Sequence, residues 1–307
     1  MQIAVVGAGG VGGYFGGRLA DAGADVVFLA RGAHLNALRA NGLRIESPGG
    51  TIRLPRVKAT DNPASVGPVD VVFFAVKLYD TDSALALVPA LVGPDTVVIP
   101  FQNGVESVDL LSGALDRSHV AGGTSYVAAV ISEPGVIRHT AMGSLVFGEL
   151  DGSRSPRLER LLEACTASGF TATLSNQITV DIWSKFVHLS VFSGMTAVTR
   201  SPVGLLREDS DLLAMWQAAV MESMAVAHAR GIELSRTLFD DIMGDLQGLP
   251  PQARSSMLED LGRGRRLELP WLSGAVVRMG RELGVETPIH RFITAVLTPH
   301  VNGSASA

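Results

Sequence analysis

A glycine-rich turn follows the first apolar segment of the chain and opens a helical pattern. The strand-like run covers residues 3–6, and the GxGxxG spacing is formed by Gly7, Ala8, Gly9, Gly10, Val11 and Gly12. In this setting the first glycine permits a tight turn, the second lets a pyrophosphate approach the backbone, and the third lets helix and strand pack closely. The amides of the helix N-terminus then face the phosphates. The turn therefore predicts a dinucleotide site, with a purely structural glycine turn as the alternative.

The end of the second predicted strand indicates which dinucleotide binds. NAD sites usually carry Asp or Glu there, about twenty residues after the glycines, to bind the ribose 2′-hydroxyl. Here the strand expected at 25–30 is followed by Arg31, and no carboxylate stands at its end. A guanidinium pairs well with the 2′-phosphate of NADP. We therefore expect NADP(H) as the cofactor; the alternative is an ordinary surface arginine.

The first part of the chain alternates β-rich runs with helical patterns. Such alternation predicts a parallel sheet with helices on both faces. The strands are expected at 3–6, 25–30, 69–76 and 96–100, and the helices near 10–22, 33–41, 80–92 and 104–113. A small hairpin insert is expected at 43–54. Further along, the sequence has apolar runs at 124–131, 135–139 and 144–148, and it predicts a helix at 156–168 and a strand at 171–174.

Beyond about residue 176 the strand patterns disappear. Helical periodicity runs through about 178–193, 203–207, 210–230, 235–246, 254–261, 270–283 and 288–299. The predicted fold is therefore an α/β Rossmann-type dinucleotide-binding domain at 1–175, followed by an all-α domain for substrate binding and catalysis at 176–307. A chain of 307 residues with 47% hydrophobic content is long enough for two such cores.

Charge and cysteine content exclude several classes of function. The net charge of −5 is interspersed, which argues against a nucleic-acid or acidic-membrane partner. The one cysteine, Cys165, lies in an apolar helical pattern, so we expect a packed, inert thiol, no disulfide and no metal site. The N-terminus lacks the basic region of a signal peptide, and no apolar run could span a bilayer, so a cytoplasmic location is expected.

Polar residues follow two of the predicted strands. Lys77 ends the run at 71–76, and Asn103 follows the run at 96–100. Ligands of open α/β sheets lie beyond the carboxyl ends of the strands, so both residues are expected to face the nicotinamide. Asn103 precedes Gly104 and could equally cap a helix, a role compatible with the first.

A single charged residue interrupts the apolar segment between Asp181 and Arg200. It is Lys185, and a helix so apolar all round is usually buried. Burial lowers the pKa of a lysine, and such a lysine can act as a general acid. The alternative is a lysine whose ammonium reaches water. The chain has only three lysines, and two of them stand at these candidate positions, which favours a functional role.

A lone carboxylate precedes the helix expected at 270–283. It is Glu268, within the segment RRLELP. An acidic residue at a helix start commonly caps the helix or interacts with its dipole, so the pattern alone does not assign Glu268 to catalysis.

The ordered set of segments resembles the ketopantoate reductase (2-dehydropantoate 2-reductase) family over about residues 1–295. The segments are GAGGVGGYFGGRL, FLARG, AVKLYD, QNGV, HTAMGSLVFGE, WSKFV, RSSML and RRLELPWLSG. The resemblance implies a Rossmann domain followed by a helical domain, with catalysis in the cleft between them. It also implies NADPH-dependent reduction of ketopantoate to pantoate, on the route to pantothenate.

The resemblance further implies roles for individual residues. Lys185 falls on the family's catalytic lysine, which protonates the ketone oxygen while hydride reaches the carbonyl carbon. Glu268 falls on the carboxylate that contacts the substrate's hydroxyl groups. Lys77 falls on the lysine at the cofactor edge, Asn103 on the cleft asparagine, and Ser256 on a substrate-contacting serine.

The chain departs from the family on the helix that carries the catalytic lysine. Well-studied members have asparagines four and eight residues after the lysine, where this chain has Leu189 and Ser193. Leu189 cannot form a hydrogen bond with a substrate, and losing one such contact can cost orders of magnitude in discrimination. The neighbouring His188 could substitute, or it could simply be a packed histidine.

Two alternatives to ketopantoate reduction therefore stay open. One is a reductase or dehydrogenase of another 2-oxoacid or hydroxyacid on the same fold. The other is a non-catalytic NADP-binding regulator, which would need neither Lys185 nor Glu268. The expected partner is a small-molecule 2-oxoacid substrate, and a homodimer is compatible with the apolar helices of 203–230.

Overall fold

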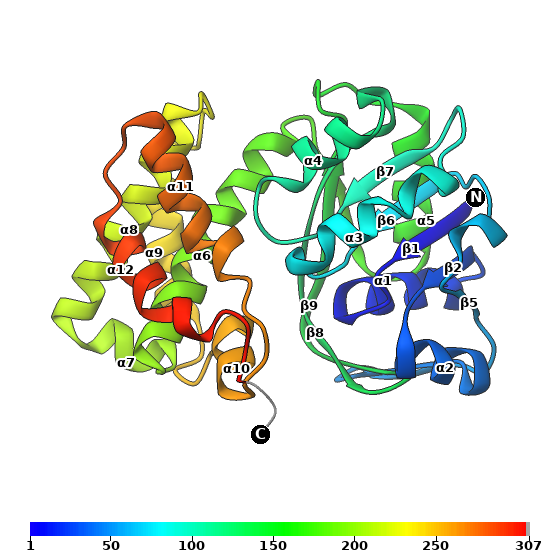
Figure 1. Cartoon of the computed structure of the whole chain (residues 1–307), viewed down its shortest axis with the longest axis horizontal. Helices are drawn as coiled ribbons and strands as arrows, with labels where there is room; N and C mark the ends of the chain where they lie inside the picture. Colours follow the sequence, from blue (N-terminus) through cyan, green and yellow to red (C-terminus); the bar gives the residue numbers. More distant parts are fainter. Residues whose placement is uncertain (305–307) are drawn as a thin grey trace. The chain divides into compact units, whose positions relative to one another are not determined.

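The computed structural model describes residues 1–304 and divides into two compact units (Figure 1). The α/β unit comprises Met1–Gln102 and Glu106–Asp181. The helical unit comprises Asn103–Val105 and the chain from Ile182 onward. The division falls inside helix α6 (Ile178–Thr199), a few residues after the 175/176 boundary expected from the sequence. Residues 305–307 of the predicted helical domain lie outside the described residues.

A parallel sheet forms the centre of the α/β unit. Its strand order is β5 (Lys58–Thr60), β2 (Asp25–Leu29), β1 (Gln2–Val6), β6 (Val71–Phe74) and β7 (Val97–Pro100). All of its strand pairs are parallel, which confirms the predicted sheet. The strand β5 was not predicted, because three partly exposed residues give too short a pattern to detect.

The connections of this sheet differ from prediction at one place. Four helices form close to their expected positions: α1 (Gly10–Asp21), α2 (Gly32–Asn41), α4 (Ser107–Ala114) and α5 (Pro156–Ala167). The single helix expected at 80–92 is wrong. The segment forms η2 (Leu78–Asp80), α3 (Thr81–Leu85) and η3 (Val88–Leu91), since Pro89 lacks the amide that a continuous helix requires. Short turns η1 (Pro63–Ser65) and η4 (Arg117–His119) complete the connections.

A second sheet belongs to the same unit. Its path is β10 (Thr171–Leu174), β9 (Val136–Gly148), β3 (Leu43–Ser47) and β4 (Gly50–Leu54), and β8 (Gly122–Glu133) pairs with β9. The predicted hairpin is confirmed as β3 and β4, with Pro48 and Gly49 at the turn. The apolar runs expected at 135–139 and 144–148 are one strand, interrupted where Met142 adopts a φ of 61°.

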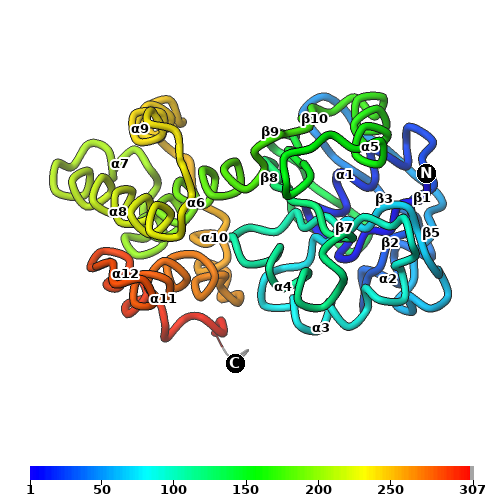
Figure 2. Tube along the Cα trace, turned by 90° about the horizontal axis from the view of Figure 1, so that it is seen from above, coloured from blue at the N-terminus to red at the C-terminus, as the bar shows by residue number. Residues whose placement is uncertain are grey.

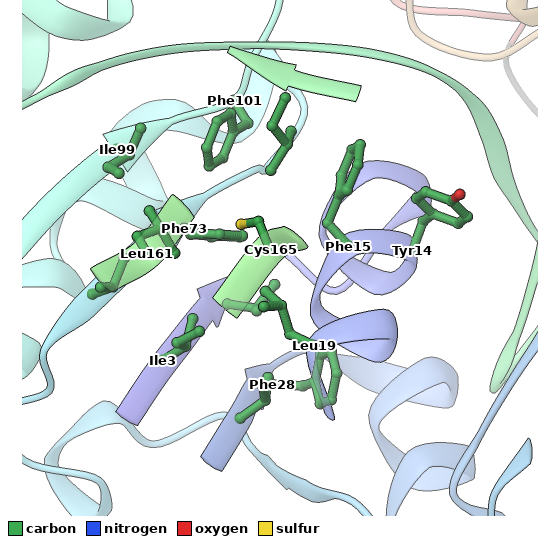
Figure 3. Close-up of a cluster of buried hydrophobic side chains, with 14 of the residues drawn as sticks. Ile3, Tyr14, Phe15, Leu19, Phe28, Phe73, Ile99, Phe101, Leu161 and Cys165 are labelled. Atoms are coloured by element: carbon green, nitrogen blue, oxygen red, sulfur yellow. The ribbon is translucent and has the colours of Figure 1, made fainter. Parts of the chain in front are cut away.

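Helix α1 packs against strands of both sheets. A Cβ atom on Gly16 would lie 2.8 Å from the ring of Phe28 in β2, and one on Gly13 would lie 2.8 Å from Ile137 in β9. The buried cluster beside α1 includes Phe15 and Leu19 from the helix (Figure 3). The repeated glycines of α1 therefore let two layers approach one helix closely.

The helical unit contains helices and turns throughout residues 182–304 (Figure 2). After α6 come α7 (Val203–Glu208), α8 (Ser210–Ala229), α9 (Leu238–Gly248), α10 (Ser256–Gly262), η5 (Leu269–Trp271), α11 (Ser273–Leu283), α12 (Pro288–Leu297) and η6 (Thr298–His300). The fully buried Trp216 lies in its main apolar cluster. In the part of the chain that the structure describes, no helix has the length and apolar character needed to cross a membrane.

Buried polar side chains connect the helices of this unit. The hydroxyl of Ser190 on α6 lies 3.2 Å from that of Ser223 on α8, which lies 2.8 Å from Nε2 of His290 on α12. The carboxylate of Glu222 accepts the backbone amides of Ile289 and His290 at 2.8 and 3.0 Å. A carboxylate at the start of α12 satisfies amides that have no partner within the helix.

Candidate active site

The glycine turn has one glycine that packing within the chain does not explain. Gly7 has a φ of +99°, and a Cβ there would lie 2.7 Å from the amide nitrogen of Val76. A Cβ on Gly12 would overlap the carbonyl oxygen of Gly7. By contrast, a Cβ on Gly9 would meet no atom within 4 Å. The backbone at Gly9 is therefore open to a ligand, as the second glycine of a dinucleotide turn requires.

The first turn of α1 is suited to bind an anion. Gly9 is the N-cap, no side chain caps the helix, and the first turn has no acidic residue. Its amides and the partial positive charge of the helix end can therefore face a pyrophosphate. Ala8 lies in the apolar core and the partly buried Val11 packs against it, so their backbone is the polar part that could bind a ligand. A Cβ on Gly10 would overlap the carbonyl oxygen of Ala129 in β8.

Arg31 follows β2 and forms an ion pair that the sequence did not predict. Its Nη2 lies 3.2 Å from Oδ1 of Asp80, in the turn after β6. The Arg31 side chain is 67% exposed and that of Asp80 is 32% exposed. Because β1 lies between β2 and β6, the pair joins segments on either side of the glycine turn.

Lys77 is exposed in the same turn, and a buried glutamine fixes the segment on which it lies. Gln102 donates to the carbonyl oxygen of Val76 at 3.0 Å and to the hydroxyl of Thr81 at 2.9 Å. Its own oxygen accepts the Ser107 hydroxyl at 2.8 Å. Gln102 was not predicted from the sequence, although a polar residue two positions after the apolar strand β7 was a usable signal.

Three predicted site residues lie together in the helical unit. Nζ of Lys185 donates to Oδ1 of Asn103 at 3.1 Å, and Nδ2 of Asn103 donates to Oε2 of Glu268 at 3.4 Å. The amide of Asn103 thus contacts both a cation and an anion. A lysine and a glutamate on opposite sides of one amide can present a proton donor and an acceptor to the same small molecule.

Neither Asn103 nor Glu268 uses its side chain to cap a helix, which was the alternative role considered for each. Helix α4 begins at Ser107 and its N-cap is Glu106, so Asn103 lies outside the helix start. Glu268 stands at the N-cap position of η5, but its side chain makes no capping hydrogen bond, and the residue is buried.

Burial and charge act in opposite directions on Lys185. The pKa of Lys185 is lowered from its usual value to about 8, because burial lowers it by more than the nearby negative charge of Glu268 raises it. At neutral pH the ammonium form therefore predominates, yet it loses its proton far more readily than an ordinary lysine.

The two α6 positions at which the family has asparagines hold an apolar side chain, Leu189, and a buried hydroxyl, Ser193. Leu189 packs against the cluster that contains Trp183 and Leu272. The hydroxyl of Ser193 is buried and has no hydrogen-bond partner among the described residues. His188 lies 3.8 Å from Asp245 on α9, and burial lowers its pKa.

Ser256 is the exposed first residue of α10, and its neighbour makes the structural contacts. Ser255 is buried, caps the amide of Leu258 at 3.0 Å and accepts the hydroxyl of Thr196 on α6 at 2.7 Å. Thr196 lies about three turns beyond Lys185 on a similar face of α6. The start of α10, which carries Ser256, is therefore hydrogen-bonded to the helix that carries Lys185.

The fold and these contacts define a class of protein. The α/β unit has an open GxGxxG turn, and the helical unit brings together a lysine, an asparagine and a glutamate. This is the architecture of a two-domain dinucleotide-dependent oxidoreductase. The family model described as ketopantoate reductase PanE/ApbA matches residues 3–152, and the model of its C-terminal part matches residues 177–300. The chain belongs to the ketopantoate reductase family.

Individual relatives agree with this assignment. A 2-dehydropantoate 2-reductase of Mesorhizobium japonicum is 32% identical, with 94% of each chain covered. The uncharacterized oxidoreductase YkpB of Bacillus subtilis is 30% identical over 97% of this chain and 98% of its own. A PanE/ApbA family ketopantoate reductase from Ralstonia eutropha superposes with a TM-score of 0.90 at 33% identity, covering 98% of each chain.

The same fold also occurs in a dehydrogenase with another name. A D-mandelate dehydrogenase in complex with NADH and anilino(oxo)acetate has a TM-score of 0.89 at 22% identity, with 98% of each chain covered. At this identity the likeness establishes the fold alone.

Proposed function

We propose that this chain catalyses the NADPH-dependent reduction of ketopantoate to pantoate. The observation that carries the proposal is the contact of Lys185 with Asn103, and of Asn103 with Glu268, within the helical unit. A regulator that only bound NADP would have no use for a half-buried lysine beside a glutamate. An enzyme that reduces a ketone needs a proton donor of this kind.

The proposed chemistry divides between cofactor and protein. When bound, a nicotinamide dinucleotide would supply the hydride for the carbonyl carbon. Lys185 gives its proton to the ketone oxygen, so the C=O double bond becomes a CH–OH group and the lysine is left neutral until it regains a proton from solvent. A pKa of about 8 suits this role, because the lysine is both protonated at neutral pH and able to release the proton.

Glu268 and Asn103 act on the lysine and on the substrate. The charge of Glu268 favours the protonated form of Lys185, and Asn103 holds the ammonium in one direction. We infer that the Glu268 carboxylate also accepts a hydroxyl of the substrate, and that Ser256 contacts the substrate from α10.

The α/β unit would hold the cofactor through its backbone and two cations. The amides after Gly9 would bind the pyrophosphate, Arg31 would pair with the 2′-phosphate, and Lys77 would contact the nicotinamide end. The free backbone face at Gly9 and the uncapped first turn of α1 fit this use.

The test follows NADPH absorbance after purified protein is mixed with ketopantoate. Wild type should oxidise NADPH, and Lys185→Ala should lose about 10²- to 10⁴-fold in kcat, the usual contribution of a general acid. Lys58→Ala is the matched control, because Lys58 pairs with Asp25 at the surface. Equal rates in wild type and Lys185→Ala would exclude Lys185 as the acid. A wild type that binds NADPH but does not oxidise it would exclude ketopantoate.

The apolar side chain of Leu189 on α6 favours a second candidate function, the reduction of a 2-oxoacid that has no side-chain hydroxyl. Leu189 offers no hydrogen bond to such a hydroxyl one turn beyond Lys185. The substrate 3,3-dimethyl-2-oxobutanoate has the carbon skeleton of ketopantoate without its hydroxyl. The ratio of kcat/KM for the two compounds therefore distinguishes the two candidate functions. If the deoxy compound is preferred, Leu189→Asn should shift the ratio toward ketopantoate.

A further inference from the structure

The ion pair between Arg31 and Asp80 spans the edge of the sheet at which the glycine turn lies. Neighbouring strands are about 4.8 Å apart, so the segments after β2 and β6 are separated by about 10 Å with β1 between them. The long Arg31 side chain covers this separation and brings Nη2 to 3.2 Å from Asp80. The guanidinium thus has an anionic partner within the protein.

The backbone at Asp80 is anchored on both sides. Its amide donates to the carbonyl oxygen of Lys77 at 2.8 Å. The next residue, Thr81, is buried and accepts Gln102 through its hydroxyl at 2.9 Å. The Asp80 carboxylate therefore stays near Arg31 because its segment is fixed, although the pair itself is partly exposed to solvent.

A 2′-phosphate and Asp80 compete for the same guanidinium. A phosphate at this position needs Arg31 as its partner and is repelled by the nearby carboxylate. A ribose 2′-hydroxyl carries no charge, so a dinucleotide without the phosphate leaves the ion pair in place. The carboxylate should consequently weaken the binding of one dinucleotide and leave the other almost unaffected.

We propose that Asp80 is a cofactor-selectivity residue that lowers the preference of this site for NADPH over NADH. The proposal rests on the proposed function in one respect, the pairing of Arg31 with the 2′-phosphate. It predicts that the wild-type protein accepts both dinucleotides, with a preference for NADPH smaller than Arg31 alone would give.

The experiment compares Asp80→Asn with Asp82→Asn in the full-length protein. Asp82 lies two residues further along, is exposed, and its substitution makes the same change in net charge. Dissociation constants for NADPH and NADH are measured by nicotinamide fluorescence at one low ionic strength. In Asp80→Asn the NADPH constant should fall about two- to fivefold, the range expected for an exposed ion pair. The NADH constant should change less than about twofold, and Asp82→Asn should change neither.

A third variant separates the two assignments. If Arg31→Ala weakens NADPH binding but Asp80→Asn leaves the NADPH/NADH ratio unchanged, the role of Asp80 is wrong and that of Arg31 stands. If Arg31→Ala leaves the ratio unchanged as well, both assignments are overturned. The gain in Asp80→Asn should also shrink at high salt, because salt screens exposed charges.

Discussion

The two units of this molecule bring their layers together by different means. In the α/β unit, glycines on α1 let strands of two sheets approach one helix. In the helical unit, hydroxyls, a histidine and a glutamate link α6, α8 and α12 inside the core. The difference matters for reading the sequence, because a glycine pattern is local and visible, whereas each buried polar pair joins residues far apart in the chain.

The largest effect expected is on the glycine contacts. Gly10→Ala should destabilise the fold by about 3 kcal/mol or more, because the new methyl group would overlap the backbone of β8 at Ala129, which cannot move cheaply. Gly9→Ala should change stability by less than about 1 kcal/mol, since no atom of the protein lies nearby. Urea denaturation of both variants measures the difference, and equal losses would refute the distinction.

Acid should destabilise the helical unit through His290. Burial lowers the pKa of His290 to about 4, from an ordinary value of 6.5. As pH falls below 6.5, the unfolded chain takes up a proton that the folded chain refuses, so stability is lost until about pH 4. The loss at this residue is about 3 kcal/mol. Denaturation at pH 7 and pH 4.5 should show a shallower pH dependence in His290→Gln, and an unchanged slope would contradict the prediction.

A smaller effect is expected where the α/β unit does rely on a buried polar side chain. Gln102→Met should cost about 1–3 kcal/mol, because the hydroxyls of Thr81 and Ser107 lose their partner. The KM for NADPH should also rise, since the segment that carries Lys77 loosens. If stability falls while KM stays constant, Gln102 supports the fold without positioning that segment.

The smallest effect concerns the charge beside Lys185. In its proposed role as the acid, Lys185 must be protonated, so the rate of reduction should fall as pH rises through about 8. Glu268→Gln removes the charge that raises the pKa of Lys185, so the falling limb should move to lower pH in that variant. The pH profile of kcat measures the shift, and a limb that stays in place or moves upward would contradict the assignment.

The features predicted correctly from the sequence depend on short-range patterns. They are the parallel sheet, the place of the glycine turn between β1 and α1, and the place of Arg31 after β2. The cofactor roles of the turn and of Arg31 stay predictions. The helix expected at 80–92 failed because Pro89 outweighed a favourable apolar period.

Long-range pairs explain most of what the sequence could not give. The pairing of β9 with β3 and the partnership of Arg31 with Asp80 join segments that no local pattern relates. Lys185 stood out by its apolar surroundings, but Asn103 lies 82 residues away from it, and Glu268 lies 165 residues from Asn103. Only the resemblance to a family linked these three residues before the structure did.

The thiol of Cys165 has a practical consequence for labelling. It is fully buried on α5 in the cluster of Figure 3, and burial raises its pKa to about 12. At pH 7 only about one thiol in 10⁵ would be ionised, and the thiolate is the form that maleimides and iodoacetamides attack. Cys165 should therefore react very little with such reagents. A cysteine introduced at an exposed position of either unit would then be the main site of labelling by a fluorophore or spin label.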